Sequence, residues 1–360
     1  MLKKAVVLIL VCGSIAGWTG CQETSSHYVY AALPGPSEIA AFREDPNSGV
    51  LTALSGSPFP SGAGPESIAI HPSGKYLYAL NAAQAQADVS LFDIAGDGAL
   101  TEVTPRAPVG SVPKVLAMDA AGSFLYVANG GSNNVTVFSI DSSDGALTEV
   151  SGSPFPVGMS PLDMKLNPAG NVLYVTGSPN ILAAFGITAS SSAATLTLIA
   201  RSDPSTSPGN GPNSIAIAPS GNYLYTANTL DSSISIFPLD PSGTFEPPTV
   251  LSEAAGARPL SLVIDPTGTY LFAANNHGNN IAVYTIASGS GALAAVSSSP
   301  FASETAPSFL AVDPSGKYLL VGSQNAAGIQ TFGIAGGTGQ LNSIATFSTA
   351  NTPSSIVVVK

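Results

Sequence analysis

The segment Asp-Ala-Ala-Gly-Ser-Phe-Leu-Tyr-Val-Ala-Asn at residues 119–129 recurs along the chain and specifies its architecture. Similar turns begin at His71, Asn167, Ala218, Asp265 and Asp313, and their glycines lie 48, 48, 51, 47 and 48 residues apart. Asp or Asn caps such a turn with its side chain, Pro fixes φ, and Gly takes the left-handed conformation. This spacing predicts an array of structural repeats rather than one ordinary globule.

Each repeat contains the pattern of four short strands. An apolar strand precedes the turn, as at residues 67–70, and a second follows it, as at residues 76–81. A third strand alternates apolar and polar residues, as at 135–138, and a fourth follows another glycine turn, as at 97–100. Helical periodicity is absent from the repeats. Four short strands in each repeat, separated by turns, are typical of four-stranded antiparallel propeller blades.

The number of blades follows from an aromatic residue at the end of the third strand. It occurs seven times, at Phe42, Phe92, Phe138, Phe185, Phe237, Tyr284 and Phe332. The first repeat starts at residue 28 with its second strand, and residues 352–359 match the missing innermost strand. We therefore predict an all-β, seven-bladed β-propeller over residues 28–360, with the C-terminal strand joining the N-terminal blade. Closure of the ring removes open sheet edges.

The first 20 residues have the pattern of a secretory signal peptide. Lys3 and Lys4 precede an apolar stretch, and small residues lead to Gly20 and Cys21. Residues 18–21 resemble a bacterial lipobox, with Trp18 where Leu is usual, and this resemblance implies lipidation of Cys21. Residues 21–27 then form the lipidated cysteine and a short tether. We expect an exported lipoprotein of the cell envelope, attached to the outer membrane or facing the periplasm, with the membrane as its partner.

Composition excludes several classes of function. The formal net charge is −11 and only 9% of residues are charged, so no basic surface is available for nucleic acid. Cys12 lies in the signal peptide, which leaves Cys21 without a partner for a disulfide and excludes a cysteine-based metal site. No two histidines have metal-ligand spacing, and we predict no metal and no cofactor.

The repeated unit resembles a known family. Leu-Tyr-Val-Ala-Asn at 125–129 and Leu-Tyr-Thr-Ala-Asn at 224–228 resemble the YVTN-type propeller repeat. Ser-Pro-Phe at 57–59, 153–155 and 299–301 resembles the lactonase-type, 6-phosphogluconolactonase-like seven-bladed propellers. The resemblance covers residues 28–360 and implies the same fold, with lactone hydrolysis as an expected activity.

The motif associated with lactonase activity is incomplete. Members with that activity carry Gly-Pro-Arg-His at the start of an innermost strand, where this chain has Gly-Pro-Glu-Ser at 64–67 and Gly-Pro-Asn-Ser at 211–214. No blade has a histidine at that position. A hydrolase would therefore need other residues as base and as oxyanion donor.

Candidate binding residues are those expected at the channel entrance, where the seven innermost strands begin. They are Glu66, Lys114, Asp163, Asn213, Arg258 and His277. Four asparagines at second-strand ends, Asn81, Asn129, Asn228 and Asn275, are interpreted as loop caps. His277 is the single weak candidate for catalysis, since His27 lies in the tether and His71 in a turn on the opposite face.

Two functions of different classes remain open from the sequence. The first is an exported, lipid-anchored propeller that binds a small polar ligand or a protein partner. The alternative is a lactone hydrolase whose catalytic residues have diverged from those of its family. The missing histidine favours the first, and whether the protein is an enzyme stays open at this point.

Overall fold

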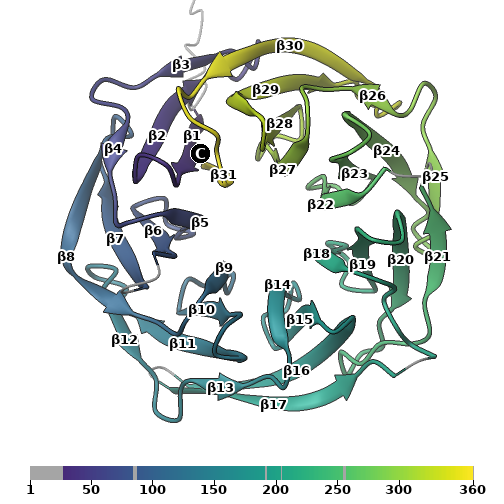
Figure 1. Cartoon of the computed structure of the whole chain (residues 1–360), viewed down its shortest axis with the longest axis horizontal. Coiled ribbons are helices and arrows are strands. Elements are labelled where there is room, and N and C mark those ends of the chain that lie inside the picture. The colour runs from purple at the N-terminus through teal and green to yellow at the C-terminus, as the bar shows by residue number, and fades with distance from the viewer. Residues whose placement is uncertain (1–26, 84–86, 191–192, 204, 254–256, 360) are drawn as a thin grey trace, which may run out of the picture.

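The fold is a ring of seven antiparallel sheets around a central channel, as predicted (Figure 1). The computed structural model describes residues 27–83, 87–190, 193–203, 205–253 and 257–359. No helix within these ranges is long and apolar enough to cross a membrane. The predicted signal peptide, Cys21 and the tether up to residue 26 lie outside the described residues.

The innermost strand of each blade lines the channel, and the others follow outward. Blade 1 contains β31 (Ser355–Val359), β1 (His27–Leu33), β2 (Glu38–Glu44), β3 (Leu51–Ala53) and β4 (Phe59–Pro60). Blade 2 contains β5 (Pro65–Ile70), β6 (Tyr76–Asn81), β7 (Asp88–Ile94) and β8 (Leu100–Pro108). Blade 3 contains β9 (Pro113–Met118), β10 (Phe124–Asn129), β11 (Asn134–Ile140), β12 (Leu147–Glu149) and β13 (Phe155–Pro156).

The remaining four blades follow the same order. Blade 4 contains β14 (Ser160–Leu166), β15 (Val172–Ser178), β16 (Ile181–Ser190) and β17 (Ala193–Arg201). Blade 5 contains β18 (Pro212–Ile217), β19 (Tyr223–Asn228), β20 (Ser233–Pro238) and β21 (Thr249–Ser252). Blade 6 contains β22 (Pro259–Ile264), β23 (Tyr270–Asn275), β24 (Asn280–Ile286), β25 (Leu293–Ala295) and β26 (Phe301–Ala302). Blade 7 contains β27 (Pro307–Val312), β28 (Tyr318–Ser323), β29 (Ala326–Ile334) and β30 (Leu341–Ser348).

The predicted ring closure is confirmed. Strand β31 pairs with β1 in antiparallel register from Tyr28↔Val359 to Ala32↔Ser355, so blade 1 combines both ends of the described chain (Figure 1). The first strand begins at His27, one residue before the expected start of the domain. His27 is buried and therefore belongs to the propeller rather than to the tether.

The outer edge of blades 1, 3 and 6 departs from the simple four-strand pattern. There the fourth strand is broken into two short segments that both pair with the third strand. The serine of each Ser-Pro-Phe motif lies at the break and accepts a backbone N–H of the third strand. The three contacts are Ser57 Oγ to Ala41 N at 2.8 Å, Ser153 Oγ to Val137 N at 3.0 Å and Ser299 Oγ to Val283 N at 2.9 Å. The motif thus replaces a ladder hydrogen bond that the break would leave unmade.

Neighbouring blades are joined by apolar packing and by buried tyrosines. Phe42 and its six equivalents are all buried. In addition, the second-strand tyrosines of four blades donate a hydrogen bond to a glycine carbonyl of the following blade. The contacts are Tyr30 to Gly98, Tyr78 to Gly145, Tyr174 to Gly243 and Tyr225 to Gly291, at 2.8–2.9 Å. These bonds satisfy a buried hydroxyl at each interface and fix the relative position of the blades.

Candidate functional site at the channel entrance

A β-bulge at the start of the innermost strands determines which side chains reach the channel. In blade 2, Pro65 pairs with Asn81 and Ser67 with Leu80, so Glu66 has no partner in the ladder. The same bulge leaves Lys114 in blade 3 and Asn213 in blade 5 without a partner in the ladder. An unpaired bulge residue is re-aimed relative to its neighbours, and bulges often occur next to functional sites. We call this end of the ring the entrance face.

The residue after the strand-start proline lines the central cavity in every blade. These seven residues are Glu66, Lys114, Leu162, Asn213, Leu260, Ser308 and Ser354, and the cavity has a volume of about 690 Å³. Only Glu66 and Lys114 of the seven are charged, and they belong to adjacent blades. The channel entrance therefore carries one acid and one base side by side in the ring.

A second cavity, of about 1140 Å³, opens beside the first between the loops of blades 2 and 3. Glu66 and Lys114 are the two residues that line both cavities. Both side chains are half-buried, and neither makes a hydrogen bond or ion pair with any described residue. The junction of the two cavities thus has an acidic and a basic group available to a ligand.

The second cavity also contains residues that the sequence analysis did not select. Asp88 and Arg106 line it, and Arg106 is held by Glu102 through bonds of 2.7 and 3.1 Å. Asp88 accepts a hydrogen bond from Asn81 at 2.6 Å. Arg106 lies on the outermost strand β8, which the repeat pattern alone places far from the channel, so no sequence signal indicated it.

Asp163 lines the central cavity, but it lies one position after the bulge residue of its strand. Leu162, not Asp163, occupies the bulge position in blade 4, and the alternation of the strand turns Asp163 toward blade 5. Its Oδ2 accepts the backbone N–H of Ile215 at 2.8 Å and its Oδ1 that of Met164 at 2.8 Å. Burial raises the pKa of the Asp163 carboxyl, while the nearby Lys165 ammonium and these backbone donors oppose that shift.

Asp163 therefore belongs to a set of side chains that link adjacent innermost strands. Ser67 Oγ accepts from Leu116 N at 3.2 Å, Ser214 Oγ from Leu262 N at 3.1 Å and Ser355 Oγ from Ile68 N at 3.3 Å. These are the positions where the lactonase motif has histidine. In this chain they line the central cavity but serve chiefly as inter-blade hydrogen-bond acceptors.

Arg258 and His277 do not join the group at the channel entrance. Arg258 precedes the strand-start proline of blade 6 and has φ of 53°, the conformation that Gly64 and Gly211 adopt in other blades. Its side chain lines neither cavity. His277 is exposed in the loop between β23 and β24 and also lines neither of them. The structure thus brings together Glu66, Lys114, Asp163 and Asn213 around the central cavity.

The four asparagines at second-strand ends act as internal caps, as interpreted from the sequence. All four are buried. Asn129 Nδ2 donates to Asn134 and Thr136, and Asn228 Nδ2 donates to Ser233 and Ser235, at 2.9–3.0 Å. Their side chains hold the entrance loops in place and are not available to a ligand.

Fold and entrance together define a closed seven-bladed propeller with a polar site on its axis. The chain belongs to the family of lactonases with a 7-bladed beta-propeller, whose sequence pattern it matches over residues 28–162 and 166–358. The comparison with curated protein sequences gives no match.

Solved structures of similar fold cover almost the whole chain. A protein from Bacteroides fragilis, provisionally named a 6-phosphogluconolactonase, is 21% identical over 94% of this chain and 99% of its own, with a TM-score of 0.79. The periplasmic gluconolactonase of Pseudomonas aeruginosa is 18% identical over 93% of this chain and 99% of its own, with a TM-score of 0.78. At these identities the likeness concerns the fold.

Proposed function

We propose that this protein is a lactone hydrolase that binds its substrate where the two cavities meet at the channel entrance. The observation that carries the proposal is the convergence of Glu66 and Lys114 on that junction in a chain of the lactonase family. The alternative that the sequence left second, a hydrolase with diverged catalytic residues, is therefore preferred to a purely binding propeller. The two residues supply the two functions that the missing Arg and His would otherwise provide.

Ester hydrolysis by this pair is chemically complete. Glu66 accepts a proton from a water molecule, and the hydroxide equivalent attacks the lactone carbonyl carbon. The Lys114 ammonium stabilises the negative charge on the carbonyl oxygen as it develops. Collapse of this intermediate breaks the bond between the carbonyl carbon and the ring oxygen. Glu66 returns the proton to that oxygen, which leaves as a hydroxyl group, and the product is the open hydroxy acid.

The charges around the cavity favour an unphosphorylated sugar lactone. The acidic residues Glu66, Asp163 and Asp265 line the central cavity together with the basic residues Lys114 and Lys165, so the attraction of the two lysines for an anion is offset. The Pseudomonas aeruginosa neighbour, named a gluconolactonase, is consistent with this choice. A phosphate ester would need a cluster of arginines or lysines, which the seven entrance positions do not contain.

The decisive experiment is turnover of glucono-1,5-lactone against its 6-phosphate by the purified protein. We expect kcat/KM for the neutral lactone to exceed that for the phosphate ester by at least about tenfold, because like charges are repelled at the cavity. Spontaneous ring opening is subtracted with a matched blank in mildly acidic buffer. Binding of the neutral lactone without turnover would instead establish a non-catalytic binding module.

We also propose that the protein is exported and anchored by a lipid on Cys21. The signal-like pattern of residues 1–20 and the lipobox resemblance support this, and the Pseudomonas aeruginosa neighbour is named periplasmic. An anchor with a short tether places a propeller close to the bilayer.

The anchor predicts a clear change in fractionation. The unmodified protein should sediment with membranes, and Cys21→Ser should move most of it to the soluble fraction, because lipid attachment requires the thiol. Immunoblots of the membrane, periplasmic and medium fractions measure the distribution. An unmodified protein found entirely in the medium would argue against lipidation.

A further inference from the structure

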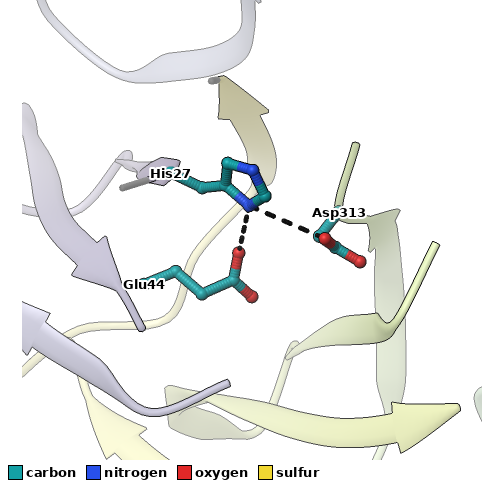
Figure 2. A group of neighbouring side chains, drawn as sticks. All are labelled: His27, Glu44 and Asp313. Atoms are coloured by element: carbon teal, nitrogen blue, oxygen red, sulfur yellow. Dashed lines mark hydrogen bonds and ion pairs between the residues drawn. The ribbon is translucent and has the colours of Figure 1, made fainter. Parts of the chain in front are cut away.

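A buried cluster of one histidine and two carboxylates lies where blade 7 meets blade 1. His27 is the first residue of β1, Glu44 the last of β2, and Asp313 opens the turn between β27 and β28 (Figure 2). The His27 Nδ1 lies 3.2 Å from Glu44 Oε2 and 3.6 Å from Asp313 Oδ2. Residue exposure is 3% for His27 and 0% for Glu44, and Asp313 is also fully buried. The cluster is on the face opposite the channel entrance.

The fold does not require His27 and Glu44, as the other blades show, whereas Asp313 caps its turn as Asp265 does in blade 6. His27 and Glu44 are cross-strand partners, and the equivalent residue to Glu44 is aliphatic in each of the other six blades. These residues are Ile94, Ile140, Ile187, Leu239, Ile286 and Ile334, each of which donates its N–H to the carbonyl at the position equivalent to His27. Blade 1 therefore has a buried acid where the repeat otherwise has an apolar side chain, and this occurs at the interface that closes the ring.

The cluster contains two carboxyl groups and one imidazole. Asp313 and Glu44 lie against His27, and all three side chains are buried. Glu44 Oε1 is buried and has no hydrogen-bond partner among the described residues. Buried carboxylates are normally paired or coordinate a metal, because desolvation of an unpaired charge is costly.

We propose that His27, Glu44 and Asp313 bind one divalent transition-metal ion, with Zn²⁺ as the expected occupant. One ligand atom from each residue lies within 4.8 Å of the others. Imidazole nitrogen and carboxylate oxygens are zinc ligands at about 2.0–2.2 Å, and the observed separations suit adjacent ligands on one ion. The unpartnered Glu44 Oε1 is available to make that carboxylate bidentate. When both carboxyl groups are ionised, their combined charge is equal and opposite to that of the ion.

The surroundings of Asp313 orient its carboxylate for this role. Its Oδ1 accepts the backbone N–H groups of Lys317 and Tyr318 at 2.7 Å, and its Oδ2 accepts that of Ser315 at 2.9 Å. Hydrogen bonds of this kind hold a ligating side chain in position. The ion would fasten the first strand of the propeller to the last blade and stabilise ring closure. It would lie away from the proposed hydrolytic site and take no part in its chemistry.

The proposal is tested on the full purified protein, prepared without a histidine tag, stripped with chelator and titrated with ZnCl₂. We expect one Zn²⁺ per chain by elemental analysis. The Tm should rise by about 3 °C or more when free zinc is a hundredfold above Kd. Co²⁺ in place of Zn²⁺ should give visible d–d absorption. Absence of stoichiometric binding in the unmodified protein would overturn the proposal.

The repeat itself supplies the variants. Glu44→Ile installs the residue that most other blades carry, so this variant should fold while losing the Co²⁺ spectrum and the zinc-dependent rise in Tm. His27→Gln should lose both readouts as well. Asp265→Asn is the matched control, because Asp265 accepts the same backbone hydrogen bonds in the blade 6 turn without a histidine beside it. Zinc binding that persists in Glu44→Ile would place the ion elsewhere and contradict this assignment.

Discussion

Deletion of residues 352–360 is expected to abolish the single cooperative unfolding transition of the propeller. The deleted segment contains β31, which forms the innermost strand of blade 1 and pairs with β1 over five residues. Without it, Val29 and Ala31 lose their cover and an open strand edge is exposed. Blade 2 also loses the hydrogen bond from Ile68 N to Ser355 Oγ.

The size of this effect follows from the apolar surface involved. β31 contributes Ile356, Val357, Val358 and Val359 to the packing on its two sides. At about 1.5–3 kcal/mol for a fully buried aliphatic side chain, and less for those half-buried, the loss is on the order of 5 kcal/mol. This is comparable with the whole free energy of unfolding of a typical domain, about 5–15 kcal/mol.

Calorimetry and denaturant titration followed by circular dichroism measure the transition. A chain that begins at His27, and so lacks only the predicted signal and tether, is the control and should unfold as the full mature chain does. An unchanged melting curve for the C-terminal deletion would show that β31 is dispensable and that the ring does not depend on this closure.

The architecture was predictable because its signals are local and repeated. The turn that begins at Asp119 is specified by a few adjacent residues, and this turn with the five similar ones gives the repeat length without any tertiary information. Ring closure was predictable for the same reason, since the sequence of residues 352–359 matches that of residues 64–70, the innermost strand of blade 2. The broken outer strands of blades 1, 3 and 6 were not, because the serine of Ser-Pro-Phe shows its bond to the third strand only in three dimensions.

The site was predicted less well because one bulge residue changes the direction of every side chain after it. The sequence analysis grouped Asp163 and Arg258 with Glu66, although Asp163 lies one position after its equivalent, Leu162, and Arg258 two positions before its equivalent, Leu260. A shift of one residue in a strand moves a side chain to the other face. Asp163 therefore bonds to blade 5, and Arg258 adopts a left-handed conformation outside the cavity.

The sequence analysis missed the cluster of His27, Glu44 and Asp313 for a different reason. Its three members come from residues 27, 44 and 313, and no ligand spacing relates them along the chain. The prediction of no metal rested on the spacing of the histidines and on the lack of a cysteine pair. The signal that was available is the acidic residue Glu44 at a position where the other repeats are aliphatic, and aligning the repeats column by column would have shown it.

Glu66→Gln and Lys114→Met should each strongly reduce lactone hydrolysis and leave stability almost unchanged. Removal of a general base typically costs about 10²–10⁴ in rate. Removal of an oxyanion donor typically lowers kcat by about 10²–10³. Both side chains are half-buried and make no bond to any described residue, so the free energy of unfolding should change by no more than about 0.5 kcal/mol.

Arg258→Met is the matched control for Lys114→Met, since it removes a cation at the same face from a residue that lines neither cavity. It should retain near-normal kcat/KM for glucono-1,5-lactone, whereas Lys114→Met should lower kcat more than it raises KM. His277→Ala should also retain activity, because His277 is exposed away from the cavities. If His277→Ala abolished turnover while Glu66→Gln and Lys114→Met remained active, hydrolysis would occur at the β23–β24 loop and not at the junction of the two cavities.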